Sequence, residues 1–374
     1  MFETVVTTLS AVAFASAAAA VAGSSPSSLW WSGLDMQHAT SHAATWGHSA
    51  VGIFTVVAVI YLAHSLIATR LSSGAFFPRK LTKTDWRQQV VVVTGGSGGV
   101  GAQLSLMLAR AGAKVAALDV VSFPSKLAEE DVSRHIKFYQ CDLTDWHSVQ
   151  ETGAAIRKDF GSVTMLVNNA GVVTAPPQCL FLVDGLPNLS AEAEASSRRI
   201  QRTINVNLTS QLWTVREFAP DMLQSSSKGG HVVTVASIMG HVGVPGLADY
   251  VVSKFGLVGL HQTLKREFRR HRGKGAPVQT TLVMPSHIST PMFEHWRLPF
   301  PFSYLTPTVT PQQVATGIFR ALESRRSSQV YFPSLTSITQ WHCLLPEALY
   351  EIQQVVSTKV EDRPFSEYGV DLLS

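Results

Sequence analysis

A glycine-rich turn between a short apolar run and a helical pattern constrains the fold of this chain more than any other segment. Residues Gln89–Thr94 (QVVVVT) are apolar and β-branched, as expected of a strand buried on both faces. The turn at 95–99 (GGSGG) leads into a helical pattern over Val100–Ala111. Backbone N–H groups in such a turn, together with the following helix N-terminus, favour a pyrophosphate. The segment therefore predicts a nucleotide-binding α/β fold.

Beyond this turn, further short apolar runs alternate with helical patterns. Such alternation is typical of right-handed crossovers and predicts one Rossmann-like, doubly wound parallel sheet. The remaining predicted strands are Lys114–Asp119, His135–Gln140, Val163–Asn168, His231–Ala236, Val278–Met284 and Gln329–Phe332. The long predicted helices are Arg198–Leu223 and Leu247–Arg270. Residues 172–197, which are rich in proline, are interpreted as a surface insertion.

An acidic residue, Asp119, ends the second predicted strand 24 positions after Gly95. A carboxylate there can accept hydrogen bonds from an adenosine ribose diol and would repel a 2′-phosphate. Val120 and Val121 follow, so no adjacent cation favours such a phosphate. A helix N-cap is the alternative role for Asp119. The prediction is therefore NAD(H) as the cofactor, with NADP less favoured.

Three residues after the fifth predicted strand have the spacing of a proton-transfer site. Ser237 is followed 13 residues later by Tyr250, and Lys254 comes four residues after that. Positions i and i+4 share one helix face, so the ammonium is predicted to lower the tyrosine pKa below its usual value of about 10. Tyr250 would then exchange a proton with an alcohol while Ser237 orients the substrate oxygen. The alternative is a surface Tyr–Lys pair.

Taken together, these motifs resemble the short-chain dehydrogenase/reductase family over roughly residues 88–335. The match to the family's phosphate turn falls on Thr94, Gly95, Gly99 and Gly101, with Ser97 as a further cofactor candidate in the same turn. The resemblance implies cofactor contacts from Asp142, Asn169, Ile288 and Thr290. It also implies a fourth catalytic residue, Asn207, holding Lys254 and a water as a proton relay. Ser286 stands where the family usually has glycine.

The N-terminal region is nearly free of charge. The whole chain has 30 Lys or Arg residues, but residues 1–69 contain none. Within them, Ala50–Thr69 is an uncharged run of 20 residues, long enough to cross a hydrocarbon layer of about 30 Å. Basic residues follow it and predict a cytosolic location for the rest of the chain. A buried core helix is the alternative. Val5–Gly23 could be another span or a cleaved signal, so one or two spans are left open.

A narrower resemblance is to the membrane-anchored retinol and 17β-hydroxysteroid dehydrogenases. It rests on residues 231–237 (HVVTVAS), 240–242 (GHV), 249–250 (DY) and 253–255 (SKF). It implies an anchor in the endoplasmic reticulum or at lipid droplets and a lipophilic alcohol or ketone as substrate. The predicted domains are an anchor region at 1–72, the NAD-binding domain at 73–335 and an amphipathic extension at 336–374. Members of the broader family often pair through their two long helices, which leaves a homodimer open.

The leading hypothesis is an oxidoreductase that moves a hydride between NAD(H) and a retinoid, steroid or long-chain lipid. The alternatives are an NADPH-dependent reductase of a lipid ketone, such as a 3-ketosphinganine-like molecule, and a non-catalytic cofactor-binding scaffold at a lipid surface. An apolar segment at 292–304 is interpreted as a substrate lid, with core packing as its alternative. The isoelectric point near 9 is assigned to membrane-adjacent basic residues rather than to nucleic-acid binding. No metal site is predicted.

Overall fold

The computed structural model describes residues 80–123, 132, 134–173, 191–224, 229–244, 247–271, 277–290 and 307–344. All of them belong to one structural unit, Ser72–Ser374. The predicted membrane run Ala50–Thr69, the apolar segment 292–304 and most of the predicted extension 336–374 lie outside the described residues. Among the residues that are described, no helix has the length and apolar character needed to cross a membrane. The division into three predicted domains stays a prediction.

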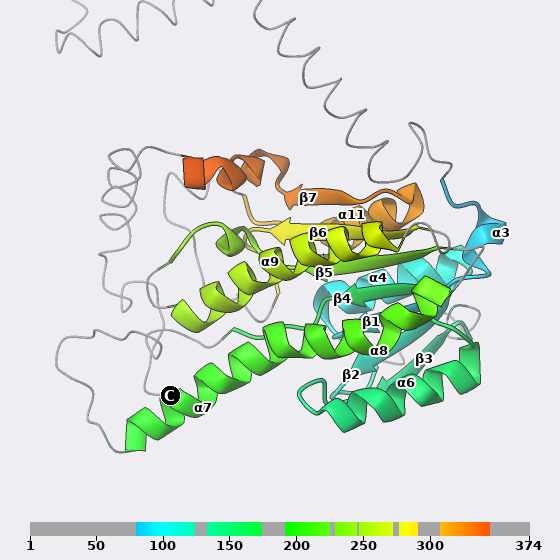
Figure 1. The fold of residues 1–374 in the computed structure, drawn as a ribbon, viewed down its shortest axis with the longest axis horizontal. Coiled ribbons are helices and arrows are strands. Elements are labelled where there is room, and N and C mark those ends of the chain that lie inside the picture. Colours follow the sequence, from blue (N-terminus) through cyan, green and yellow to red (C-terminus); the bar gives the residue numbers. More distant parts are fainter. Residues whose placement is uncertain are drawn as a thin grey trace, which may run out of the picture. The chain divides into compact units, whose positions relative to one another are not determined.

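A parallel sheet of seven strands forms the centre of the described fold (Figure 1). Its order is β3-β2-β1-β4-β5-β6-β7, so the chain begins in the middle and reverses direction between β1 and β4. In open α/β sheets, ligands bind at the carboxyl edge beside such a reversal. The strands are β1 (Val90–Thr94), β2 (Lys114–Asp119), β3 (Ile136–Gln140), β4 (Met165–Asn168), β5 (Gly230–Val235), β6 (Val278–Pro285) and β7 (Ser328–Phe332). The predicted Rossmann-like fold is confirmed, and the strand ends fall within two residues of their predicted positions.

Helices cover both faces of the sheet (Figure 1). One face is covered by α4 (Gly99–Ala111) and α11 (Pro311–Ser324), with the short α3 (Lys83–Trp86) beside them. The other carries α6 (Trp146–Phe160), α8 (Ser210–Gln224) and α9 (Ala248–Arg270). Two further short elements, η3 (Ile238–Gly240) and η6 (Ser334–Leu344), follow β5 and β7.

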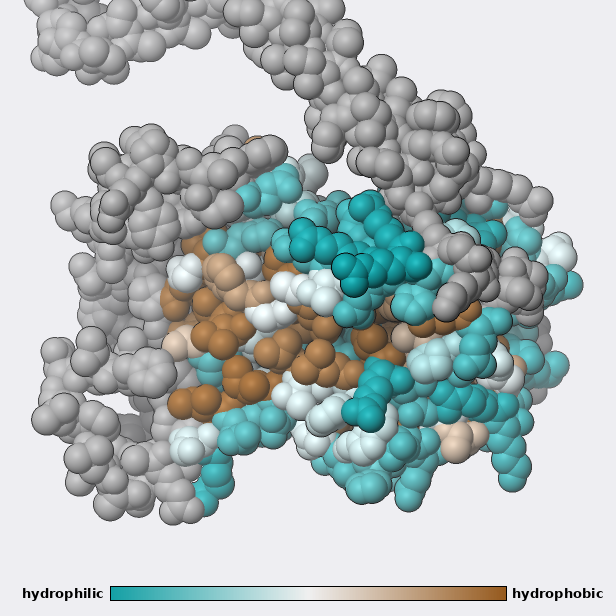
Figure 2. Space-filling view, viewed as in Figure 1, coloured by the Kyte–Doolittle hydropathy of each residue, from teal (hydrophilic) through white to brown (hydrophobic). Residues whose placement is uncertain are grey.

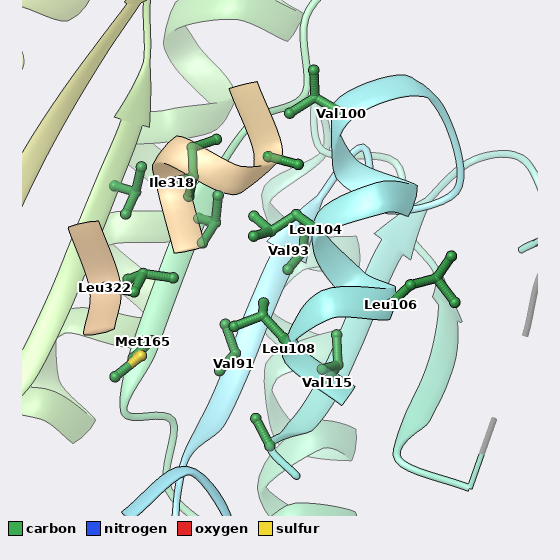
Figure 3. Close-up of a cluster of buried hydrophobic side chains, with 14 of the residues drawn as sticks. Val91, Val93, Val100, Leu104, Leu106, Leu108, Val115, Met165, Ile318 and Leu322 are labelled. Carbon is green, nitrogen blue, oxygen red and sulfur yellow. The ribbon is translucent and has the colours of Figure 1, made fainter. Parts of the chain in front are cut away.

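The valine run of β1 is explained by its central place. Val91 and Val93 belong to the apolar cluster on the α4 face, whereas Val90 and Val92 belong to the cluster on the opposite face. Figure 3 shows Leu104 and Leu108 of α4 beside Val93 and Val91. Because both faces are buried, an apolar residue is needed at every position rather than at alternate ones. Truncation of a fully buried leucine in such a core costs about 2–5 kcal/mol.

The predicted helix Arg198–Leu223 differs from the structure. It consists of α7 (Ala191–Ile204), a π-helical turn η2 (Asn205–Thr209) and α8. The side chain of Asn207 in this turn bonds both backbone groups of Val172: its Oδ1 accepts from N at 2.7 Å, and its Nδ2 donates to O at 2.9 Å. These contacts hold the wide turn, which the sequence pattern did not indicate. The predicted insertion 172–197 is also partly helical, because α7 begins at Ala191.

Candidate active site

The turn between β1 and α4 is shaped by glycines with left-handed backbone angles. Gly95 has φ +61° and Gly99 has φ +47°, conformations that side chains rarely tolerate. Gly101 is required for space, because a Cβ there would collide with the carbonyl oxygen of Gly95 and approach Asn169 Nδ2. The turn and the N-terminus of α4 thus form a backbone cradle, in which the N–H groups of Gly96 and Ser97 donate to Leu118 and Asp119. This geometry fits a pyrophosphate.

Two predicted cofactor residues, Thr94 and Asn169, fasten this turn to β4. Asn169 Nδ2 donates to the carbonyl oxygens of Thr94 at 3.0 Å and Gly95 at 3.2 Å. The Thr94 hydroxyl accepts from the backbone N of Asn169 at 3.0 Å and of Ala170 at 3.1 Å. All of these contacts are within the protein. In this structure the two side chains therefore hold the cradle in place.

Asp119 reaches the same turn from the end of β2. Its Oδ2 accepts from the backbone N of Ser97 at 3.1 Å, and its Oδ1 accepts from the backbone N of Val121 at 3.2 Å. The hydroxyl of Ser97 is buried, with no hydrogen-bond partner among the described residues. A dinucleotide offers matching groups: phosphate oxygens for the unpaired hydroxyl and ribose hydroxyls for the carboxylate. The residues present therefore fit such a cofactor.

The other predicted cofactor contacts also lie along the carboxyl edge of the sheet. Thr290 lies close to the turn, because a Cβ on Gly99 would be 3.6 Å from its Cγ2. Ile288 is buried and forms an isolated parallel bridge with Val309. Asp142 is exposed after β3, and its Oδ1 accepts from the backbone N of Thr144 at 2.9 Å. The structure thus brings residues from the ends of β2, β3 and β6 to one edge.

Three predicted catalytic side chains are buried together where β5 ends and α9 begins. Tyr250, Lys254 and Ser237 are each at most 6% exposed. The Ser237 hydroxyl caps η3 by accepting from Met239 N at 3.2 Å, and it donates to the carbonyl oxygen of Pro285 at 3.3 Å. It also hydrogen-bonds Tyr250. Its one hydrogen therefore has two possible acceptors, the Pro285 carbonyl and the Tyr250 oxygen.

Asn207 and Lys254 approach each other over Gly171. A Cβ on Gly171 would lie 3.4 Å from Asn207 Oδ1 and 3.7 Å from Lys254 Nζ. Lys254 Nζ donates to Val235 O at 3.2 Å, and Asn207 Nδ2 also donates to the hydroxyl of Ser253 at 3.2 Å. Sequence reasoning did not identify Ser253 or Val172 as the partners of Asn207. The position of Ser253, four residues after Asp249 on the inner face of α9, was the available signal for the former.

The predicted pKa of Tyr250 is wrong for this arrangement of residues. Burial raises its pKa to about 12, and the hydrogen bond from Ser237 opposes that rise. Lys254 Nζ lies 5.3 Å from the centre of the tyrosine ring and donates to a backbone carbonyl instead of the phenol. Burial also lowers the pKa of Lys254 to about 8. Desolvation of both groups thus outweighs the electrostatic attraction between the Lys254 ammonium and the Tyr250 phenolate, on which the prediction was based.

Comparison with models of protein families identifies the family to which this chain belongs. The family model for short chain dehydrogenase matches residues 89–299. The chain belongs to the short-chain dehydrogenase family. The matched range contains the glycine turn, Asp119, Asn207, Ser237, Tyr250 and Lys254.

Several curated members of this family resemble the chain over most of their length. Human epidermal retinol dehydrogenase 2 is 30% identical over 251 residues, which cover 66% of this chain and 74% of that protein. Estradiol 17-beta-dehydrogenase 11 of Pongo abelii is 27% identical over 322 residues, or 81% of this chain and 95% of that protein. The dehydrogenase RED2 of Cochliobolus heterostrophus is 36% identical over 228 residues, or 59% and 78%. This chain is therefore an oxidoreductase of the same family.

Proposed function

We propose that this short-chain dehydrogenase moves a hydride between NAD(H) and a lipophilic alcohol or ketone, using Ser237, Tyr250, Lys254 and Asn207. The observation that carries the proposal is the burial of the Ser237, Tyr250 and Lys254 side chains at the sheet edge that also bears the glycine turn. Burial of ionisable groups costs free energy, and groups whose pKa values are perturbed in this way cluster at functional sites. Bound NAD supplies the hydride acceptor in oxidation, and its reduced form supplies the donor in reduction.

In the proposed oxidation, Tyr250 takes the hydroxyl proton of the alcohol. Its pKa of about 12 means that the phenolate needs help from neighbouring groups. The hydrogen bond from Ser237 supplies part of this help, and the value of about 12 already includes it. The Lys254 ammonium, which faces the phenol ring, adds positive charge. In reduction, the Tyr250 hydroxyl returns the proton to the substrate oxygen. Asn207 holds the backbone of Val172 beside Lys254, and a water there would complete the relay.

NAD is proposed over NADP because of Asp119. Its carboxylate lies against the turn that would hold the phosphates, so a 2′-phosphate would meet a negative charge. The two side chains that follow, Val120 and Val121, are exposed and carry no cation. Kinetics with both cofactors test this directly. A clear preference for NADP would contradict the assignment and favour the alternative, a biosynthetic reductase of a lipid ketone.

The substrate class is proposed from the relatives. Two of them are named for retinol and estradiol, which are both lipophilic alcohols. A retinoid, steroid or long-chain lipid alcohol is therefore the class to test. The decisive experiment is a screen of such alcohols and ketones in detergent with NAD and NADP in parallel, together with Tyr250→Phe. Turnover that survives this substitution would refute the mechanism. Absence of turnover on every lipid would favour a cofactor-binding scaffold.

We also propose that the chain is held at a membrane of the endoplasmic reticulum or a lipid droplet, with its catalytic domain in the cytosol. The support is the uncharged run Ala50–Thr69 and the basic residues that follow it. Deletion of residues 1–72 tests this proposal. The shortened chain should leave the membrane fraction, and its retention there would refute the anchor.

A homodimer through α8 and α9 is proposed as well. Three large apolar side chains on these helices are exposed: Leu212 (45%), Val252 (60%) and Phe255 (44%). Figure 2 shows hydrophobic surface over this part of the molecule. A second copy would remove these side chains from water. Light scattering of the full chain and of Val252→Glu in the same detergent should give masses differing by one protomer.

A further inference from the structure

The carboxyl end of β6 carries a buried hydroxyl that the proposed reaction does not use. Ser286 is 8% exposed, and its Oγ has no hydrogen-bond partner among the described residues. A buried hydroxyl without a partner is destabilising. No described residue therefore accounts for this hydroxyl.

One hydrogen bond links the residue before Ser286 to the candidate catalytic serine. The preceding carbonyl, that of Pro285, accepts the hydrogen bond from Ser237 Oγ at 3.3 Å. Standard covalent geometry then limits the separation of the two hydroxyl oxygens to less than about 9 Å. The backbone N of Ser286 donates to Phe332 O at 2.8 Å, which continues the pairing of β6 with β7 and holds the residue in place.

Strand alternation indicates which face of the sheet Ser286 occupies. Leu282 and Met284 belong to the apolar cluster packed against α9, together with Leu257 and Val258. Because successive strand residues alternate between faces, Ser286 continues the Leu282–Met284 row toward the side on which α9 carries Tyr250. The unpaired hydroxyl is thus at the carboxyl edge, directly after the Leu282–Met284 row that packs against α9.

We infer that Ser286 is a specificity residue that hydrogen-bonds a second oxygen of the substrate, close to the reacting carbon. This inference rests on the proposed function. Ser237 already has protein partners on its hydroxyl, whereas Ser286 has one donor and two acceptor positions to offer. The preferred substrates would be lipophilic vicinal diols and the matching α-hydroxy ketones. A simple alcohol would leave the Ser286 hydroxyl buried and unpaired, which disfavours its binding.

The test compares two ketones that differ by one hydroxyl group, 1-hydroxydecan-2-one and decan-2-one. Binding to the full chain in detergent, saturated with oxidised cofactor, is measured by calorimetry, because that complex cannot reduce either ketone. The absorbance of reduced cofactor is followed alongside to verify that the hydroxyl of 1-hydroxydecan-2-one is not oxidised. The wild-type chain should bind the hydroxy ketone about tenfold more tightly. Ser286→Ala and Ser286→Gly should remove this preference without changing the dissociation constant of NAD. The glycine variant restores the usual family residue and serves if the alanine variant folds poorly.

Ser105→Ala is the matched control, because Ser105 in α4 also has a fully buried and unpaired hydroxyl. It should keep the wild-type preference. The inference is overturned if the wild type binds the two ketones equally or binds neither, if Ser286→Ala keeps the preference, or if the substitution weakens NAD binding instead. Turnover of the corresponding alcohols is measured separately. A ketone preference without any turnover would count against the proposed function and leave the assignment of Ser286 intact.

Discussion

Two buried histidines predict that the described fold loses stability in mild acid. His231 at the start of β5 and His261 in α9 are each 2% exposed. Burial, followed by the nearby charges of Arg325 and His261, lowers the pKa of His231 to about 3. Burial, followed by the charge of Lys265, lowers the pKa of His261 to about 4. Both imidazoles are therefore neutral in the folded chain at every pH above 5.

The sign of the effect follows from the unfolded state, in which a histidine has a pKa of about 6.5. Between that value and the lower folded pKa, only the unfolded chain takes up the proton, so stability falls as the pH falls. From pH 7 to pH 5, each histidine should reduce the free energy of unfolding by about 2 kcal/mol. The stability that each provides is fully present above about pH 7.

The perturbation is His231→Gln, which keeps a nitrogen for the 2.8 Å hydrogen bond between His231 Nε2 and Thr281 Oγ1. Urea unfolding of the full chain in a mild detergent, followed by tryptophan fluorescence, gives stability at several pH values from 7 to 5. The variant should lose about 2 kcal/mol less than the wild type over this range. His147→Gln is the control, because His147 is exposed on α6 and should follow the wild-type curve. Parallel curves for the wild type and His231→Gln would refute the reasoning.

Other substitutions test the site and its support. Gly171→Ala puts a methyl group between the Asn207 amide and the Lys254 ammonium. In steady-state kinetics kcat should fall at least tenfold, whereas thermal unfolding should show little change in the melting temperature. An unchanged kcat would contradict the proposed relay. Arg157→Leu removes the cation that pairs with Glu217 at 2.6 Å and Asp221 at 3.0 Å on α8. The free energy of unfolding, measured by urea titration, should fall by about 2–3 kcal/mol. A fall below about 0.5 kcal/mol would show that these ion pairs contribute no more than ordinary surface pairs. Asp119→Ala should raise the ratio of NADP to NAD efficiency at least tenfold, and an unchanged ratio of kcat/KM values would remove Asp119 from cofactor selection.

The central sheet was predictable because the residue types of its strands match the burial of those strands in the fold. Val90 to Val93 are β-branched and apolar, and the structure buries them on both faces. The π-helical turn at Asn207 was not predictable in this way, since its side chain is held by Val172, which is 35 residues away in sequence. A helical sequence pattern depends only on residues about one turn apart, so it cannot indicate a contact between residues this distant in sequence.

The placement of the proposed catalytic residues was also predictable, but the direction of their pKa shifts was not. Spacing alone placed Tyr250 and Lys254 on one face of α9, where the structure has them. The direction in which the Tyr250 pKa shifts depends on how much water the fold removes from the phenol. The spacing of Tyr250 and Lys254 in the sequence gives no information on that burial. Likewise, the buried hydroxyl of Ser286 became notable only when the surrounding strands showed that nothing bonds it.

The hydrogen bonds that attach the glycine turn to the end of β4 affect the order in which the domain folds. The turn is made early, but Asn169 and Ala170, which donate to Thr94, come 75 and 76 residues later. Between them the chain must first build β2, β3 and α6. During synthesis at about 5–20 residues per second, several seconds therefore separate the emergence of the turn from that of the strand that fixes it. A nascent chain that stops before residue 169 carries the whole glycine motif and still lacks the fastened cradle.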